Sequence, residues 1–273
     1  SRSLSFAQDP SSSLLESNVI TQNTAAEGGG IATYNGAPTI RNNLLIANTA
    51  TGPQGGGGLF ISGDSSDVTA TGNTIANNTS ASLQGGGIFL QEGDAFISNS
   101  ILWQNQGDLY NASATYSDVT DLSQSPGTGN ISSDPLFIQT TNPDAQGYYR
   151  LSNTSPCIDA GDPSYQVEPD EIDIDGKPRI VARIDMGADE LPDLKGPTIS
   201  NVTFNTTPLA DGMALHDSGT FRLLASDPAS VSRVEFSLDG TLIGTDTDGS
   251  NNYSCPWDIY QTEDGTHTLT ITA

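Results

Sequence analysis

The sequence predicts an all-β protein, a parallel β-helix followed by a small β-sandwich, and three observations carry this prediction. A unit of 25 to 30 residues recurs in the first half of the chain, and three successive copies end in a run of glycines followed by an aliphatic residue. Gly, Asn, Ser and Thr are abundant, and no apolar stripe with the period of a helix persists. Residues 198–273 instead form short alternating segments between turns.

The repeat comes into register when the glycine runs are aligned. Asn-x-x-x-x-Asn-Thr precedes each run, as NVITQNT, NLLIANT and NTIANNT, and a degenerate copy, SILWQNQ, follows at 100–106. The last glycines of the runs, Gly30, Gly58 and Gly87, are 28 and 29 residues apart. Units of this length with short β-prone pieces are typical of solenoids. The dense leucine pattern of leucine-rich repeats is missing.

Stacked coils place equivalent residues about 4.8 Å apart. We therefore expect an inward aliphatic stack from the pairs Val19/Ile20, Leu44/Leu45, Thr74/Ile75 and Ile101/Leu102. We also expect an asparagine ladder at a turn where Asn adopts the left-handed region, formed by Asn23, Asn48, Asn78 and Asn105. The glycines let the backbone turn tightly, or pack where a side chain would clash. A phosphate-binding loop is rejected, because no lysine or helix start follows them.

These motifs resemble a known family. GGGI together with N-x-x-x-x-N-T is similar to the repeats of right-handed parallel β-helix proteins, a group that includes surface adhesins, autotransporter-like passengers and polysaccharide lyases. The resemblance covers about residues 10–110 and implies a right-handed solenoid. It implies no single activity, since one scaffold hosts many functions.

A second series of motifs occupies residues 130–190: NISSDPLF, GYYRL, SPCIDAGD, DIDGKPR and DMGADE. The series resembles the choice-of-anchor Q segment of bacterial and archaeal surface β-helix proteins, which implies an extracellular protein whose β-helix ends here. Its prolines and apolar residues predict a cap over the last coil, because an open solenoid exposes strand edges. The apolar residues are Leu136, Phe137, Tyr149, Leu151 and Ile158.

Eleven carboxylates lie between residues 159 and 193. Glu171, Asp173 and Asp175, followed by glycine, echo the start of a calcium loop, in which alternate carboxylates converge on the ion. An EF-hand is rejected, because Ala182 stands where the bidentate glutamate is required. We expect either a different Ca²⁺ site at Glu171, Asp173 and Asp175 or ion pairing of these acids, and the two can coexist. The basic residues available for pairing are Lys177, Arg179 and Arg183.

The C-terminal part predicts a separate domain. VEFSLDGTLIGTDT, PWD and DGTHTLTITA resemble bacterial Ig-like domains of secreted enzymes and adhesins. The resemblance implies that Phe236 and Trp257 lie in the core and that His267 is a structural residue within a strand. It also implies that the sandwich lacks or just reaches its last strand. It suggests a piece of a longer polypeptide, or subunits that complete each other by strand donation. We divide the chain into coils at 1–129, an acidic terminal coil and cap at 130–190, a linker at 191–197 and an Ig-like sandwich at 198–273.

Composition restricts the partners. The chain has 9 Lys and Arg against 33 Asp and Glu, a formal net charge of −24. Nucleic acids and anionic membranes require basic residues, so neither is an expected partner, and no stretch is long enough to span a bilayer. Hard cations suit this composition, as does solubility in an extracellular medium. Cys157 and Cys255 lie in different predicted domains, which favours buried free thiols.

Catalytic residues are not expected. A polysaccharide lyase needs a base such as Lys or Arg, yet the first 149 residues hold only Arg2 and Arg41. A glycoside hydrolase needs two facing carboxylates, and both histidines lie in the sandwich. Four acids follow consecutive glycine runs, but acids in loops are usually solvated: Asp64, Asp67, Glu92 and Asp94.

We therefore predict an extracellular structural or adhesive protein. Its β-helix would contact polysaccharides or other surface proteins, or assemble into fibres. Ca²⁺, if the acidic segment binds it, is the one cofactor that the sequence suggests. The alternative is the non-catalytic C-terminal part of a secreted polysaccharide lyase or glycoside hydrolase.

Overall fold

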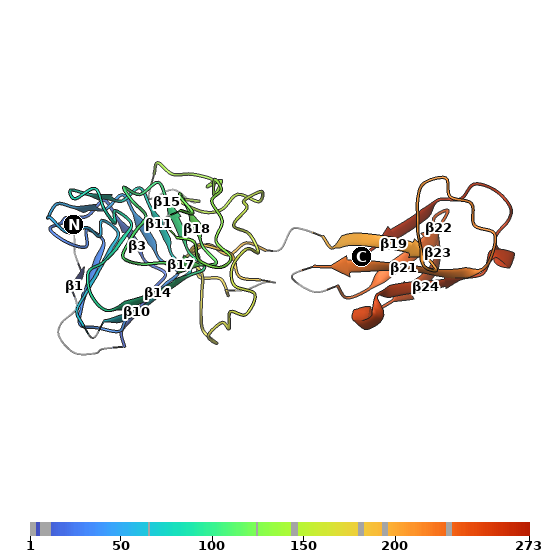
Figure 1. Cartoon of the computed structure of the whole chain (residues 1–273), viewed down its shortest axis with the longest axis horizontal. Helices are drawn as coiled ribbons and strands as arrows, with labels where there is room; N and C mark the ends of the chain where they lie inside the picture. The colour runs from blue at the N-terminus through green and yellow to red at the C-terminus, as the bar shows by residue number, and fades with distance from the viewer. Residues whose placement is uncertain are drawn as a thin grey trace. The chain divides into compact units, whose positions relative to one another are not determined.

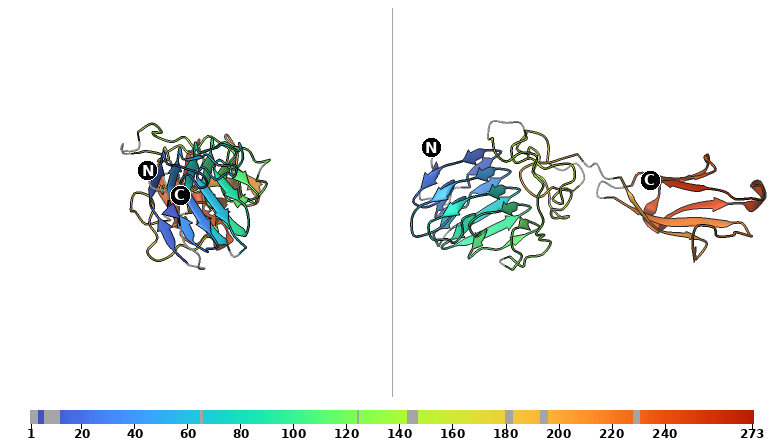
Figure 2. Two further views of the ribbon diagram at one scale, coloured as in Figure 1. Left: turned by 90° about the vertical axis from the view of Figure 1, so that its left-hand side faces the viewer. Right: turned by 90° about the horizontal axis from the view of Figure 1, so that it is seen from above.

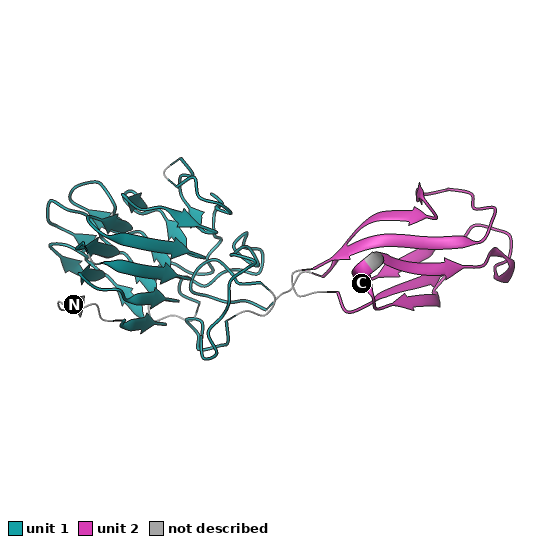
Figure 3. Cartoon of the chain, turned by 60° about the horizontal axis from the view of Figure 1, so that its bottom comes forward, with its two compact units in different colours: residues 1–192 teal, residues 193–273 magenta. Residues whose placement is uncertain are grey.

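The computed structural model describes residues 4–5 (backbone), 12–64, 66–123, 125–142, 147–179, 183–192, 196–227 and 231–273. Two compact units, Ser1–Pro192 and Asp193–Ala273, divide the chain (Figure 3). The described elements are strands, apart from two short 3-10 helices in the second unit, η1 (Gly249–Asn251) and η2 (Ile259–Gln261). Of the predicted linker at 191–197, residues 193–195 lie outside the described residues.

The first unit is a parallel β-helix whose coils pass through four sheets (Figures 1 and 2). Sheet 1 contains β1 (Leu4–Ser5), β5 (Ile31–Tyr34), β9 (Leu59–Ser62), β13 (Ile88–Leu90) and β16 (Leu109–Tyr110). Sheet 2 contains β2 (Leu14–Glu16), β6 (Thr39–Arg41), β10 (Asp67–Thr71), β14 (Asp94–Ser98) and β17 (Ala114–Thr115). Sheet 3 contains β3 (Val19–Thr21), β7 (Leu44–Ile46), β11 (Thr74–Ala76), β15 (Ile101–Trp103) and β18 (Asp118–Val119). Sheet 4 contains β4 (Thr24–Ala25), β8 (Thr49–Ala50) and β12 (Thr79–Ser80).

The interior of the β-helix is an aliphatic stack. The residues after the three glycine runs, Ile31, Leu59 and Ile88, point inward and pair in register, and Leu109 of β16 continues their row. Sheet 3 adds its second residues: Ile20, Leu45, Ile75, Leu102 and Val119. The prediction that both residues of each sheet 3 pair point inward is wrong for the first one, because successive side chains of a strand alternate. Val19 is 48% exposed, and Leu44, Thr74 and Ile101 face outward.

The corners beside sheet 3 need left-handed backbone at one residue per coil. Between sheets 2 and 3 these residues are Ser17, Asn42, Gly72, Asn99 and Tyr116. Between sheets 3 and 4 they are Gln22, Ala47, Asn77 and Gln104. The predicted ladder asparagines therefore do not themselves adopt this conformation, since each follows the residue that does.

Two side-chain ladders run along the corners of sheet 3. In the predicted one, the Asn78 carboxamide oxygen accepts the Asn48 backbone N–H at 2.8 Å and its Nδ2 at 3.1 Å, while Asn78 Nδ2 donates to the Leu45 carbonyl. The same pattern joins Asn23, Asn48, Asn78 and Asn105. A second ladder, not predicted, joins Asn18, Asn43, Asn73, Ser100, Ser117 and Asn130. Buried backbone groups are thereby satisfied without charge.

The glycine runs combine both of the roles expected for them. In the second run, Gly56 has a φ of +80°, which an L-residue rarely adopts. Gly57 has an ordinary φ, but a Cβ there would lie 2.3 Å from the Thr79 carbonyl oxygen and 2.6 Å from that of Gly86. At Gly58 a Cβ would lie 2.7 Å from the Gly87 carbonyl oxygen. Neighbouring coils thus leave no room for a side chain.

Residues 130–190 contact both the last coil and the side of the β-helix. The Ile131 N–H donates to the Ser117 carbonyl at 3.0 Å, and the Ser133 N–H donates to Asp118 Oδ1 at 3.1 Å. After the bridge between Asp118 and Ile131, the chain turns back and lies alongside the coils, as the right-hand view of Figure 2 shows in yellow. Leu136, one of the apolar residues expected in the cap, is 40% exposed. The other apolar residues expected there pack against the apolar outer face of sheet 3, with Tyr149 beside Leu44 and Leu151 and Ile158 beside Ile101.

The second unit is a β-sandwich. One sheet has the order β20 (Thr207–Pro208), β19 (Thr198–Phe204), β21 (Gly219–Ser226) and β24 (Tyr253–Trp257). The other has the order β23 (Thr241–Asp246), β22 (Val234–Leu238) and β25 (Leu269–Thr272). Phe236 is buried and Trp257 packs against the same core. His267 precedes β25 rather than lying in a strand, and contacts Asp239 and the Glu263 carbonyl. Cys157 and Cys255 are buried free thiols, as predicted.

Candidate functional site

The acidic segment lies over sheet 3, and we call residues 147–179 and 183–191 the lateral segment. Tyr148, Tyr149 and Ala188 share one apolar cluster with Leu44 and Ile46 of β7. A second cluster contains one residue of β15 and four of the lateral segment: Ile101, Leu151, Cys157, Ile158 and Met186. Each fully buried aliphatic side chain contributes about 1.5–3 kcal/mol. These contacts explain why sheet 3 is apolar on both faces.

Arg179 connects two sequence motifs of the lateral segment, DIDGKPR and DMGADE. Its guanidinium is completely buried, pairs with Glu190 at 3.0 Å, and donates to the Gly187 carbonyl at 2.7 Å. It also donates to the carbonyls of Asp185 and Asp189. Arginine suits this place because its several donors lie in a fixed fork. DIDGKPR and DMGADE therefore form one docking element.

The docking element meets sheet 3 through backbone. The Gly187 N–H donates to the Asn99 carbonyl at 2.8 Å, and the Ala188 N–H donates to Thr74 Oγ1 at 3.0 Å. A Cβ at Gly187 would lie 2.7 Å from Ile101 Cδ1. Glycine therefore allows the close approach that these two bonds require.

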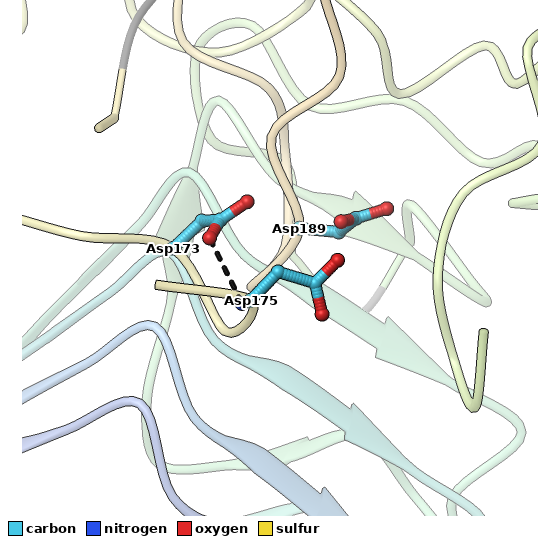
Figure 4. A group of neighbouring side chains, drawn as sticks. All are labelled: Asp173, Asp175 and Asp189. Carbon is cyan, nitrogen blue, oxygen red and sulfur yellow. Dashed lines mark hydrogen bonds between the residues drawn. The ribbon is translucent and has the colours of Figure 1, made fainter. Parts of the chain in front are cut away.

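Asp173, Asp175 and Asp189 form the acidic group of the site (Figure 4). One carboxylate oxygen from each lies within 4.8 Å of the others. Asp173 Oδ1 accepts the backbone N–H groups of Asp175 and Lys177, both at 2.8 Å, which fixes the turn after it. Asp189, which comes from DMGADE, was not among the predicted ligands, since sequence spacing does not reveal that the two motifs meet.

A cation already lies beside this group. Arg150 pairs with Asp175 at 2.6 Å and lies 3.8 Å from Asp189, and Lys177 pairs with Asp175 at 3.4 Å. Burial alone would raise the pKa of Asp175, but the hydrogen bonds and charges of Arg150 and then Lys177 hold it below its usual value. Burial raises the pKa of Asp189 to about 6 despite Arg150. A Ca²⁺ ion would have the oxygen donors it prefers here, but it would compete with the Arg150 guanidinium.

Glu171, the first of the three predicted ligands, lies in a different cluster. Its carboxylate accepts hydrogen bonds from the Tyr165 hydroxyl at 2.9 Å and from Asn42 Nδ2 at 3.0 Å, and Arg41 Nη1 is 3.6 Å away. Arg41 also pairs with Glu16 at 2.7 Å. Glu171 thus fastens the lateral segment to sheet 2 and to its corner. The structure brings Asp173 and Asp175 together, but not with Glu171.

Two further buried acids carry raised pKa values. Burial and then the charge of Glu190 raise the pKa of Asp185, whose oxygens accept the Asp159 N–H at 2.7 Å and the Leu191 N–H at 2.8 Å. Burial raises the pKa of Asp118 to about 7, and Cys157 Sγ donates to this carboxylate at 3.3 Å. Burial, then Asp118, raises the pKa of the Cys157 thiol, so it is not a reactive thiolate.

The outer face of sheet 2 is exposed, in contrast to sheet 3. One row of side chains crosses it in register: Leu14, Thr39, Thr69 and Phe96. Phe96 is 62% exposed and Leu14 is 53% exposed. The row spans three steps between strands, or about 14 Å. We call these four residues the sheet 2 row.

The loop acids are exposed rather than enclosed. Asp67 and Asp94 are register partners on β10 and β14, and both are exposed, as are Asp64 and Glu92. They lie at the edge of an open face, so their arrangement does not provide the enclosed carboxylate pair that a glycosidase uses.

Comparison with known proteins agrees with this architecture. Residues 3–121 match the family model for a right handed beta helix region, and residues 201–271 match that for a bacterial Ig domain. The chain is a right-handed parallel β-helix joined to an Ig-like β-sandwich. Domains of these two kinds are typical of surface or secreted proteins. Neither a curated protein nor a solved structure gave a match. Among the described residues, no helix has the length and apolar character needed to cross a membrane.

Proposed function

We propose that the chain is an extracellular scaffold that binds neutral glycans through the sheet 2 row. The observation that carries this proposal is the exposure of this face. Sheet 3 is covered by the lateral segment, whereas sheet 2 presents Phe96 and Leu14 to solvent with threonines between them. An aromatic ring, an aliphatic side chain and two hydroxyls at fixed spacing suit the apolar faces and hydroxyls of a sugar chain.

Charge supports a neutral glycan as the ligand. The chain has a formal net charge of −24, and the register partners Asp67 and Asp94 lie beside the row. Polyanionic glycans would be repelled, particularly at low ionic strength. The rigid backbone ladders would hold the row in place, so little conformational entropy is lost on binding.

Affinity electrophoresis in gels that contain one polysaccharide each tests the proposal. Neutral glucans, mannans and xylans should retard the full chain, whereas polygalacturonate should not. Phe96→Ala should weaken the retarding interaction about tenfold, as loss of a contact worth about 1.4 kcal/mol would. Tyr260→Ala is the matched control, because Tyr260 is 93% exposed in the other unit. Equal effects of both substitutions, or retardation only by polygalacturonate, would contradict the proposal.

In the alternative function the chain also binds a glycan, but as part of a secreted enzyme rather than as a scaffold. As the non-catalytic part of a secreted polysaccharide lyase or glycoside hydrolase, this chain would position an enzyme on its substrate. The resemblance of residues 130–190 to choice-of-anchor Q segments favours a surface protein instead. Incubation of the chain with polyuronates, followed by absorbance of unsaturated products and by a reducing-sugar assay, tests for activity in the chain itself.

A further inference from the structure

The His267 side chain connects two loops of the Ig-like unit. One is the turn between β22 and β23, which contains Asp239, and the other is the loop of residues 262–268 that leads into β25. Nδ1 of His267 lies 2.5 Å from Asp239 Oδ2, and Nε2 lies 2.7 Å from the Glu263 carbonyl oxygen. The imidazole ring therefore contacts an oxygen with each of its nitrogens.

Both of these oxygens can only accept hydrogen bonds. An ionised carboxylate and a carbonyl have no proton to donate, and a neutral imidazole has a single N–H group. One ring nitrogen of neutral His267 would thus direct its lone pair at an acceptor. The imidazolium form has two N–H groups and satisfies Asp239 and the Glu263 carbonyl together, so the geometry fits the protonated side chain.

The charges around His267 favour the same form. Asp239 faces it from the turn, Glu263 and Asp264 belong to the loop, and Asp211, from the segment between β20 and β21, lines the same pocket as His267. Among the described residues that line this pocket, His267 alone is basic. Hydrogen bonds to Asp239 and then to the Glu263 carbonyl raise the pKa of His267, and the contact with His267 holds the pKa of Asp239 below its usual range.

The pairing of β25 with β22 does not depend on the imidazole. The Thr268 N–H donates to Asp239 Oδ1 at 2.7 Å, and the Asp239 N–H donates to the Thr268 carbonyl at 2.9 Å. These two bonds hold the end of the loop next to the turn whether His267 is charged or neutral. The protonation state of His267 therefore acts on the part of the loop that precedes it.

We infer that His267 is a pH-sensitive latch, which fixes the loop of residues 262–268 in acidic solution and releases its Glu263 side in alkaline solution. The Nε2 proton is the one lost to solvent, because the bond from Nδ1 to the Asp239 carboxylate is charge-assisted and stronger. The ring is 26% exposed, so solvent can take up this proton. A group whose pKa is raised in the folded state stabilises it at low pH and loses that contribution as pH rises through the folded pKa.

Nuclear magnetic resonance of the full chain tests the latch. At about pH 5.5 both ring nitrogens of His267 should carry a proton, and at about pH 8.5 Nε2 should have lost its proton. The heteronuclear NOE of the Asp264, Gly265 and Thr266 amides should fall over the same range, because the loop then loses its bond to the ring. The midpoint of both changes should lie above 6.5, the ordinary value for histidine.

Three variants separate the latch from a general effect of pH. Asp239→Asn keeps an oxygen for the Thr268 N–H but removes the charge, so it should lower the midpoint by about one pH unit or more. His267→Gln should make the order of the loop independent of pH. His216→Gln is the matched control, because His216 is an exposed histidine of the same unit, and it should leave the response of the loop unchanged.

Two wild-type results would overturn the inference: a single protonated ring nitrogen at about pH 5.5, or equal order of the loop at both pH values. A pH response that persists in His267→Gln would assign it to another group and likewise overturn the latch. The wild-type measurements need no variant, so a substituted chain that fails to fold does not weaken the test.

Discussion

The coils and the lateral segment are stabilised by different interactions, although they share one face of sheet 3. The coils repeat the same backbone hydrogen bonds and carry neutral amide ladders, so the backbone groups buried at these corners are satisfied without charge. The lateral segment contains only isolated bridges, and buried ions hold it in place, above all Arg179 with Glu190. Periodic sequence therefore yields a structure that depends little on charge, whereas the aperiodic segment depends on particular ionised residues.

The largest expected loss of stability follows from removal of the buried Arg179, which stabilises the lateral segment but not the coils. Arg179→Met should destabilise the first unit by about 3–5 kcal/mol, because Glu190 is left buried without its cation. Calorimetry should show a lower Tm for this unit, and hydrogen exchange should increase first in the lateral segment. Arg233→Met is the matched control, since Arg233 is 62% exposed and its ion pair should contribute less than about 1 kcal/mol. Equal losses of stability from the two substitutions would contradict the conclusion that a buried ion pair holds the lateral segment in place.

A substitution in the ladder tests the coils. Asn78→Ala removes the bonds to Asn48, Leu45 and Asn105 and should cost about 2–3 kcal/mol, since buried backbone groups lose their partner. Asn23→Ala, at a half-buried rung, should cost less. Thermal melts at 0.05 and 0.5 M NaCl measure both. The loss should be independent of salt, and a strong salt dependence would show that charge also matters in the coils.

The pH dependence of stability should come from buried acids in the lateral segment and in the coil beneath it. Asp118 and Asp189 have folded pKa values of about 7 and about 6, above their unfolded values. Groups with raised pKa values stabilise the fold fully at low pH and lose that contribution as pH rises through the folded pKa. The free energy of unfolding of the first unit should therefore be larger near pH 5 than near pH 8, by about 2 kcal/mol or more. Its Tm should be correspondingly higher near pH 5. Asp118→Asn, which removes one titrating group, should reduce this difference; an unchanged difference would contradict the assignment.

The smallest expected effect concerns calcium. Arg150→Ala removes the guanidinium beside Asp175 and Asp189, so stability should fall by about 1 kcal/mol and return on addition of Ca²⁺. In the wild-type chain, 5 mM EDTA followed by excess Ca²⁺ shows by the change in Tm whether the ion binds despite Arg150. An Arg150→Ala chain whose Tm does not respond to Ca²⁺ would show that these acids form no calcium site.

Local patterns were sufficient for the coils. A glycine run that recurs every 28 or 29 residues predicts stacked units, and the residue after it, such as Leu59, enters the core. The second ladder could also have been predicted from the sequence, since Asn18, Asn43 and Asn73 recur as regularly as the asparagines of the predicted ladder. The prediction that Leu44 points inward was wrong. Leu44 and Leu45 are both apolar, so the sequence does not indicate which of them faces the interior and which faces the lateral segment.

The candidate site was less accessible to this reasoning. Glu171, Asp173 and Asp175 are evenly spaced, but the chain between Glu171 and Asp173 crosses a sheet corner and separates their carboxylates. Asp189 of the group belongs to a different motif, DMGADE, and the neighbouring Arg150 belongs to a third, GYYRL. Charge spacing along the chain therefore suggested a cation site without showing that an arginine lies beside it.

The sequence by itself determined the β-helix, the sandwich and the acidic character of the connecting segment, because each follows from contacts repeated at a fixed period or from composition. Only the tertiary structure decided that most of the connecting segment covers the side of the solenoid. That position depends on aperiodic long-range contacts, such as Gly187 against Ile101 and Arg179 against its carbonyls. Such contacts leave no period in the sequence, so their location is decided only when the chain is folded.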